Sequence, residues 1–218
     1  MKAYVIHIPT SEVSVTSAHR LIETAKYDGN INVELWNGVH RDGSFRKMYN
    51  KGLRLRKSNQ WESNSYLDCI VGCFMSHFSL WEESVRTNER IMVLEHDARF
   101  IKKLPSDRTF NNCKYDIIGI NDPSMATRKS KLYHDKILEG TQFFKPVPTI
   151  DEFNVPQGLA GNSAYVIKPE GARKMLALAE EHGMWPNDAL MCKQLINTIG
   201  VTKNFYTRVQ GLRSTTTL

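Results

Sequence analysis

The chain has 218 residues, 41% of them hydrophobic, so it can bury one sizeable core but is short for two full domains. Its 29 lysine and arginine residues exceed its 23 acidic residues, and the net charge of +6 suits an anionic small ligand, an anionic membrane surface or nucleic acid. No apolar stretch approaches the ~20 residues of a membrane span, and the first residues lack a signal-peptide pattern. We therefore expect one domain over residues 1–218, in a soluble, cytoplasmic protein without a transmembrane segment.

The basic residues are scattered, apart from two short runs at 54–57 and 128–131. Neither run is interleaved with the aromatic residues of a nucleic-acid stacking platform. We therefore expect no nucleic-acid partner, whereas peripheral contact with a membrane surface is compatible with the charge.

The four cysteines are expected to be reduced in a cytoplasmic protein. Cys69 and Cys73 have a spacing that could begin a zinc site. A closed zinc site needs four ligands, however, and no second pair follows at a matching interval.

Apolar strand patterns alternate with amphipathic helical patterns along the chain. The strand patterns occupy residues 4–8, 31–36, 91–94, 115–120 and 164–167, and the helical patterns occupy 17–27, 72–85, 169–183 and 187–200. Residues 37–64 and 124–160 lack clear periodicity, so we expect two long surface loops there. The alternation predicts an α/β fold with a mostly parallel central sheet and long loops.

The strongest periodic signal is the helix at 72–85. Phe74, Phe78, Trp81 and Val85 stand at positions i, i+4, i+7 and i+11, which places them on one helical face. We expect this face to be buried in the core.

Residues 91–97 read Ile-Met-Val-Leu-Glu-His-Asp, an apolar run that ends at two carboxylates around a histidine. The run suits a strand covered on both faces, and ligands of open α/β sheets gather outside the carboxyl ends of strands. Glu95 and Asp97 point the same way if the backbone stays extended, so they could share one divalent cation or one sugar hydroxyl. His96 would then point the opposite way. Taken alone, the segment also fits a solvated strand end without function.

Several ordered blocks resemble glycosyltransferase family 25. Residues 72–77, Gly-Cys-Phe-Met-Ser-His, and residues 93–97, Val-Leu-Glu-His-Asp, are similar to the family's Gly-Cys-x-x-Ser-His helix and its strand ending in Glu-Asp-Asp. The strand at 115–119, the block at 161–172 and a late aspartate, Asp188, also match. Together these blocks cover roughly residues 65 to 195, and their order is more specific than any one of them.

The resemblance implies a single Rossmann-like nucleotide-sugar transferase domain of the GT-A type. It implies transfer of a hexose, galactose or glucose, from a UDP-sugar to a glycan or protein hydroxyl with inversion, as in lipooligosaccharide and collagen galactosyltransferases. Asp97 and Glu95 would hold Mn²⁺ or Mg²⁺ and contact the donor, which Ser76 and His77 would border. Asp188 would be the general base that takes the proton of the acceptor hydroxyl.

The chain also departs from the family pattern. His96 replaces an aspartate, Ile70 stands where glutamate is common, and the arginine-rich turn after the first strand is missing, which removes charge from a diphosphate site. Asp188 in the first turn of a helix is favoured by the helix dipole without any function, by ~0.3–1 kcal/mol. A lone histidine beside an apolar stripe, such as His77, is commonly a hydrogen-bonded core residue.

Two other functions therefore stay open from the sequence. One is a catalytically degenerate relative that binds a nucleotide sugar or a glycan without turnover, which the altered Glu-His-Asp motif suggests. The other is a basic nucleic-acid-binding protein, which only the net charge suggests.

Overall fold

The computed structural model describes residues 1–56, 65–125, 129–150 and 158–212. Its centre is a seven-stranded sheet in the order β2-β1-β3-β7-β5-β8-β6. These strands are β1 (Lys2–His7), β2 (Glu34–Asn37), β3 (Ile91–Glu95), β5 (Ile117–Gly119), β6 (Phe144–Pro146), β7 (Ala164–Ile167) and β8 (Ile199–Thr202), while β4 (Ala98–Phe100) and β9 (Thr207–Val209) form a separate two-stranded sheet.

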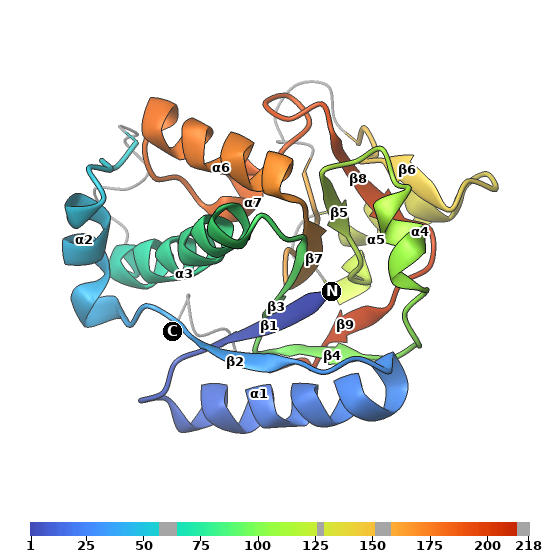
Figure 1. Cartoon of the computed structure of the whole chain (residues 1–218), viewed down its shortest axis with the longest axis horizontal. Helices are drawn as coiled ribbons and strands as arrows, with labels where there is room; N and C mark the ends of the chain where they lie inside the picture. The colour runs from blue at the N-terminus through green and yellow to red at the C-terminus, as the bar shows by residue number, and fades with distance from the viewer. Residues whose placement is uncertain (57–64, 126–128, 151–157, 213–218) are drawn as a thin grey trace.

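Helices surround this sheet (Figure 1). They are α1 (Glu12–Thr24), α2 (Arg41–Asn50), α3 (Leu67–Thr87), α4 (Asp107–Asn111), α5 (Ser130–Leu138), α6 (Pro169–His182) and α7 (Asn187–Leu190), with a π-helical turn η1 (Ala25–Gly29) after α1 and a 3-10 turn η2 (Pro123–Met125). No helix of the described ranges is long and apolar enough to cross a membrane.

Most strands of the central sheet run in one direction. β1 pairs in parallel with β2 and β3, and β5 pairs in parallel with β8. β7 is antiparallel to both β3 and β5, and β6 is antiparallel to β8. The predicted α/β fold with a mostly parallel sheet is therefore confirmed. The reversal of β7 brings its first residues beside the carboxyl end of β3, where Leu94 pairs with Ala164.

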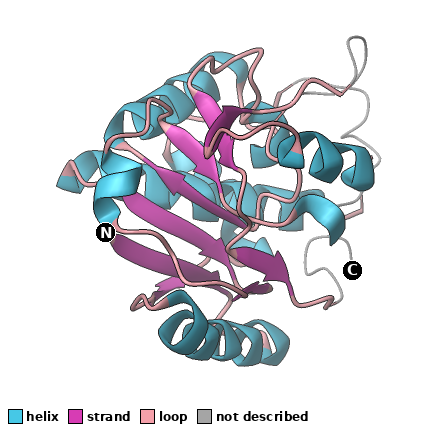
Figure 2. Cartoon of the chain, turned by 90° about the vertical axis from the view of Figure 1, so that its right-hand side faces the viewer, coloured by secondary structure: helices cyan, strands magenta, loops and turns pink. Residues whose placement is uncertain are grey.

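The sheet is covered by apolar residues on both faces. Ile91 and Val93 of β3 pack in the cluster that includes α3 and α6, whereas Met92 and Leu94 pack in the cluster that includes α1. Figures 1 and 2 show α1 on one side of the sheet and α3 and α6 on the other. Trp81 of α3 has none of its surface exposed, which confirms the predicted buried stripe.

The structure differs from the sequence prediction in several places. The segment 37–64, expected to be a loop, contains α2, and the segment 124–160 contains α5, β6 and the end of η2. The short elements β4, α4 and β9 were not predicted. The predicted last helix ends at Leu190, because residues 199–202 form β8 and pair with β5 and β6. Pairing in the sheet thus outweighs the local helical pattern. Parts of both expected loops and of both basic runs lie outside the described residues, at 57–64, 126–128 and 151–157.

Candidate functional site

The Gly-Cys-x-x-Ser-His motif of α3 contains two pairs of residues, and the two members of each pair are one helical turn apart. The first pair, Gly72 and Ser76, holds the segment between β2 and α2. A Cβ on Gly72 would lie 2.6 Å from the Val39 carbonyl oxygen, so glycine permits this close approach. The Ser76 hydroxyl accepts the Val39 N–H at 2.8 Å and donates to the Gly72 carbonyl at 2.7 Å.

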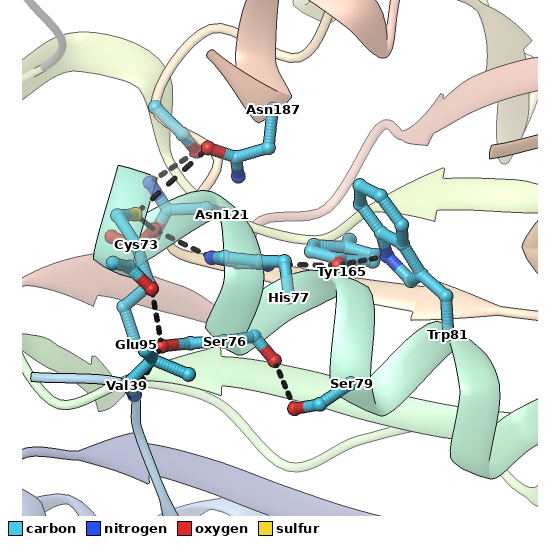
Figure 3. Close-up of polar contacts among 12 residues, drawn as sticks. Val39, Cys73, Ser76, His77, Ser79, Trp81, Glu95, Asn121, Tyr165 and Asn187 are labelled. Carbon is cyan, nitrogen blue, oxygen red and sulfur yellow. Dashed lines mark hydrogen bonds and ion pairs between the residues drawn. The ribbon is translucent and has the colours of Figure 1, made fainter. Parts of the chain in front are cut away.

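The second pair, Cys73 and His77, meets Glu95 at the end of β3 (Figure 3). His77 Nε2 lies 3.0 Å from Glu95 Oε1, and Cys73 Sγ lies 4.0 Å from the same oxygen. Behind His77, its Nδ1 lies 2.9 Å from the Tyr165 hydroxyl, which also accepts the Trp81 indole N–H at 2.9 Å. Trp81, Tyr165, His77 and Glu95 thus form a continuous hydrogen-bonded series from the core to the sheet edge.

For a neutral His77, the two ends of this series favour one direction of its hydrogen bonds, because Trp81 donates and the Glu95 carboxylate accepts. The Trp81 indole nitrogen can only donate, so the Tyr165 oxygen accepts there and its own proton can go to His77 Nδ1. His77 then carries its proton on Nε2 and donates it to the carboxylate of Glu95. The imidazole is held in one orientation by both of its nitrogens, as a histidine that orients another site residue commonly is.

Three carboxylates gather near this end of β3. Asp97 lies in the turn between β3 and β4, and Asp188 lies in α7. Burial, and then the negative charge of Glu95, raise the pKa of Asp97 to about 7. The same two causes, in the same order, raise the pKa of Asp188. Burial raises the pKa of the Cys73 thiol well above its usual value, and Glu95, Asp188 and Asp97 add to that shift.

Much of the surface of Asp188 is accessible to solvent. The protein atoms packed around its carboxylate are nevertheless the main cause of its raised pKa. Both observations fit a carboxylate that water can reach but that many protein atoms surround. The negative charge of Glu95 therefore acts on both Asp97 and Asp188, although these two aspartates are 91 positions apart in the chain. A site with three repelling carboxylates favours a cation or a hydroxyl donor as ligand.

Two sets of side chains offer metal ligands. Asp97 Oδ1 is buried without a hydrogen-bond partner among the described residues, and with Glu95 it supplies the oxygen ligands that Mn²⁺ and Mg²⁺ prefer. Cys73, His77 and Glu95 have ligand atoms within 4.8 Å of one another and suit a softer ion. Both nitrogens of His77 already have partners, so a cation there would replace the bond to Glu95.

The remaining predicted site residues are placed deeper in the protein. Ser76 and His77 are each 1% exposed and have hydrogen-bond partners within the fold, so their contact with a donor stays a prediction. Burial lowers the pKa of His96. A histidine carries no negative charge in either protonation state, so His96 does not supply the charge of the aspartate that it replaces.

From the sequence, no role in the site was expected for Asn162, Ser163 or Asn187. Pro186 is the N-cap of α7, and Asn187 is its first residue. All three side chains are buried, with polar atoms that have no partner in the described part of the chain. The available signal was the cluster of polar residues directly before the apolar run at 164–167.

Comparison with known proteins agrees with the sequence resemblance. The model of glycosyltransferase family 25 (LPS biosynthesis protein) matches residues 14–191. "Inactive glycosyltransferase 25 family member 3" of Mus musculus is 35% identical over 128 residues, which are 56% of this chain and 19% of that protein. "Procollagen galactosyltransferase 2" of Mus musculus is 26% identical over 129 residues, with the same two shares. The chain thus spans about a fifth of the length of these relatives.

Solved glycosyltransferase structures resemble the chain more distantly. Galactosyltransferase LgtC in complex with donor and acceptor sugar analogues aligns with a TM-score of 0.46 and 11% identity, over 92% of this chain and 73% of that one. The apo form of mouse xyloside xylosyltransferase 1 aligns with a TM-score of 0.45 and 11% identity, over 91% of this chain and 83% of that one.

Proposed function

Because the chain belongs to glycosyltransferase family 25, we propose that residues 1–218 act as one inverting transferase domain that uses a UDP-sugar. The transferred sugar is a hexose, galactose or glucose, and the acceptor is a hydroxyl of a glycan or protein. The observation that carries this proposal is the meeting of Glu95, Asp97 and Asp188 at one end of the sheet, with one Asp97 oxygen buried and unpartnered.

Asp97 and Glu95 are the residues that would hold a divalent cation, Mn²⁺ or Mg²⁺. When bound, such a cation supplies a positive charge that stabilises the diphosphate as it leaves the sugar. Glu95 is held for this purpose by His77, whose orientation is fixed by Tyr165. The chain thereby limits the movement of one ligand before any cation arrives.

Asp188 is proposed as the general base. The acceptor hydroxyl oxygen forms a bond to the anomeric carbon, the bond from that carbon to the diphosphate oxygen breaks, and the hydroxyl proton passes to the Asp188 carboxylate. A carboxylate with a raised pKa is a better proton acceptor near neutral pH than an ordinary one, and Asp188 has such a shift. Its exposure to solvent leaves it accessible to an acceptor.

A second candidate is a relative that binds the donor without turnover. It is favoured by His96, which brings no negative charge between Glu95 and Asp97, and by the word "inactive" in the name of the mouse relative. The two candidates share the donor site and differ in whether a sugar is transferred.

Thermal melting with added ligands tests both candidates. A transferase of the proposed kind gains stability from UDP together with Mn²⁺, and it releases UDP from UDP-galactose or UDP-glucose when an acceptor is present. Stabilisation by UDP without any metal effect or turnover supports the second candidate. A response to a short DNA duplex alone would refute both.

A further inference from the structure

We infer that Asn162, Ser163 and Asn187 form the subsite that holds the hydroxyl groups of the donor's hexose. The inference rests on the proposed function, because it takes the hexose to arrive on a nucleotide bound at the end of β3. The three side chains are only 7%, 3% and 7% exposed. Both amide atoms of Asn162, the Ser163 hydroxyl and the Asn187 amide nitrogen have no hydrogen-bond partner among the described residues.

Such a concentration of unpaired polar atoms is unusual in a protein interior. Most buried polar side-chain atoms have at least one hydrogen-bond partner, because an unmade bond leaves the desolvation of the group uncompensated. Here four atoms from two segments have no hydrogen-bond partner in the part of the chain that the structure describes. Buried polar groups without internal partners are expected where a ligand supplies the missing bonds.

Two contacts place the segments that carry these residues beside the end of β3. The Ser163 carbonyl accepts the Glu95 N–H at 2.8 Å, which places the start of β7 beside the end of β3. Asn187 Oδ1 lies 3.9 Å from Cys73 Sγ, which in turn is 4.0 Å from Glu95 Oε1. Figure 3 shows Asn187, Cys73 and Glu95 converging from α7, α3 and β3. The turn with Asn162 and Ser163 and the start of α7 therefore both lie beside the end of β3 that carries Glu95.

The turn that carries Asn162 is fixed against the rest of the protein. The Asn121 amide donates to the Gly161 carbonyl at 3.4 Å, and the Tyr133 hydroxyl donates to the Gly158 carbonyl. A Cβ on Gly158 would lie 2.9 Å from the Asp188 carbonyl oxygen, so the segment packs closely on α7. Asn162 and Asn187 are thus presented by two elements that already touch, without a ligand to bring them together.

The chemistry of these atoms matches a neutral sugar. Asn162 offers a donor and an acceptor, the Ser163 hydroxyl can do either, and Asn187 offers its nitrogen because its oxygen faces Cys73. Sugar hydroxyls both donate and accept, whereas an ionised phosphate offers only acceptors and would leave Asn162 Oδ1 without a donor. A site that forms hydrogen bonds to particular hydroxyl groups also discriminates against sugars that lack those groups.

Isothermal titration of the whole chain in Mn²⁺ with UDP, UDP-galactose and UDP-glucose tests the inference. We expect Asn162→Ala and Asn187→Ala each to weaken binding of the preferred UDP-hexose about 3–10-fold, the value of one neutral hydrogen bond. Binding of UDP without a sugar should change less than twofold. Because neither amide atom of Asn162 has a partner among the described residues, the melting temperature of unliganded Asn162→Ala should be no lower than that of the parent. Asn187→Ala also removes the oxygen that lies 3.9 Å from Cys73 Sγ, so its melting temperature should fall only slightly.

Two asparagine variants serve as controls. Asn197 is exposed, so Asn197→Ala should change neither binding nor melting. The Asn121 side chain donates hydrogen bonds to the Asp122 and Gly161 carbonyls, so Asn121→Ala should lower the melting temperature. If the Asn162 or Asn187 variant does not fold, Ser163→Ala, which deletes only a hydroxyl, replaces it in the same titrations.

The possible failures differ from one another. Equal weakening of UDP and UDP-hexose, or unchanged binding of UDP-hexose, would overturn the subsite while leaving the donor site in place. A parent protein that binds neither UDP nor UDP-hexose would overturn the proposed function, and the subsite with it.

Discussion

The two sides of Glu95 are built in opposite ways. Toward the core, Trp81, Tyr165 and His77 hydrogen-bond one another in series and end on the carboxylate. Toward the sheet edge, Asp97, Asn162, Ser163 and Asn187 carry buried atoms without partners in the described part of the chain. The comparison indicates that the hydrogen-bonded side holds Glu95 rigidly, whereas the other side keeps polar atoms free to bind a ligand. This division is expected where a protein gives up some stability in order to bind.

The largest effect is expected from the unpaired side. Asp97→Asn should abolish metal-dependent transfer or donor hydrolysis while leaving the fold intact, because the amide is a much weaker cation ligand than the carboxylate. UDP release measured at increasing Mn²⁺ checks this, with circular dichroism to confirm folding. Glu95→Gln should be milder. Near-parental turnover of the Asp97 variant would show that the metal assignment is wrong.

Asp188→Asn should lower turnover by roughly 10²–10⁴-fold with little change in UDP affinity, because only proton transfer is lost. Steady-state kinetics and UDP titration on the same preparation separate the two quantities. Asp135→Asn, at an exposed position on α5, is the control. Equal loss of UDP binding would make Asp188 a donor contact, and full activity would leave it as an aspartate favoured by the helix dipole.

On the paired side the largest expected effect is on stability. Trp81 is fully buried and donates to Tyr165, so Trp81→Ala should lower the free energy of unfolding by about 3–5 kcal/mol through the cavity it leaves. Urea denaturation measures the change. A melting temperature within a degree or two of the parent would be incompatible with this packing.

Tyr165→Phe tests the hydrogen-bonded series with less disturbance of packing. It leaves the Trp81 indole N–H and His77 Nδ1 without the hydroxyl, so we expect a loss of about 1–3 kcal/mol in stability. If the series also orients Glu95, Mn²⁺ affinity should fall about 10–100-fold. Tyr49→Phe, on the exposed surface of α2, should change neither quantity. Lower stability with unchanged Mn²⁺ affinity would limit the series to a packing role.

The smallest effect concerns pH. The folded-state pKa of Asp97, about 7, lies above its ordinary value of 3.8, so the folded protein holds this proton more tightly than the unfolded chain. The stability present near pH 4 is therefore lost as pH rises toward 7. With a chelator present, Asp97→Asn should be more stable than the parent at pH 8, by about 1–2 kcal/mol after allowance for solvent screening. The difference should vanish near pH 4.

The elements that the sequence predicted correctly are those in which one local pattern decides the outcome. The stripe through Phe74, Phe78 and Trp81 predicted α3, and the uninterrupted apolar run predicted a strand buried on both faces, as β3 is. The apolar residues between Cys192 and Ile199 fitted a helical stripe equally well. They end in a strand because β5 and β6 provide pairing partners that no local pattern reveals.

The candidate site was predictable to a similar extent. Glu95 and Asp97 end a recognisable strand pattern, and Asp188 was singled out only by the family resemblance. The link from Tyr165 to His77 joins residues 88 positions apart, and no spacing rule predicts it. The unpaired state of Asn162 and Asn187 depends on what surrounds them in three dimensions, so composition and periodicity could not have indicated it.

The antiparallel course of β7 has a consequence for the order in which the protein folds. Leu94 pairs with Ala164, so the carboxylates and the turn with Asn162 join only when segments 70 positions apart dock. The parallel unit of β1, β2 and β3 with α1 and α3 precedes β7 in the chain and can begin to fold first during synthesis, whereas contacts of high sequence separation form slowly. A partly folded chain would therefore present Glu95 and Asp97 before the turn with Asn162 is in place. The insertion of β7 would then be the step that gives the protein its selectivity for a sugar.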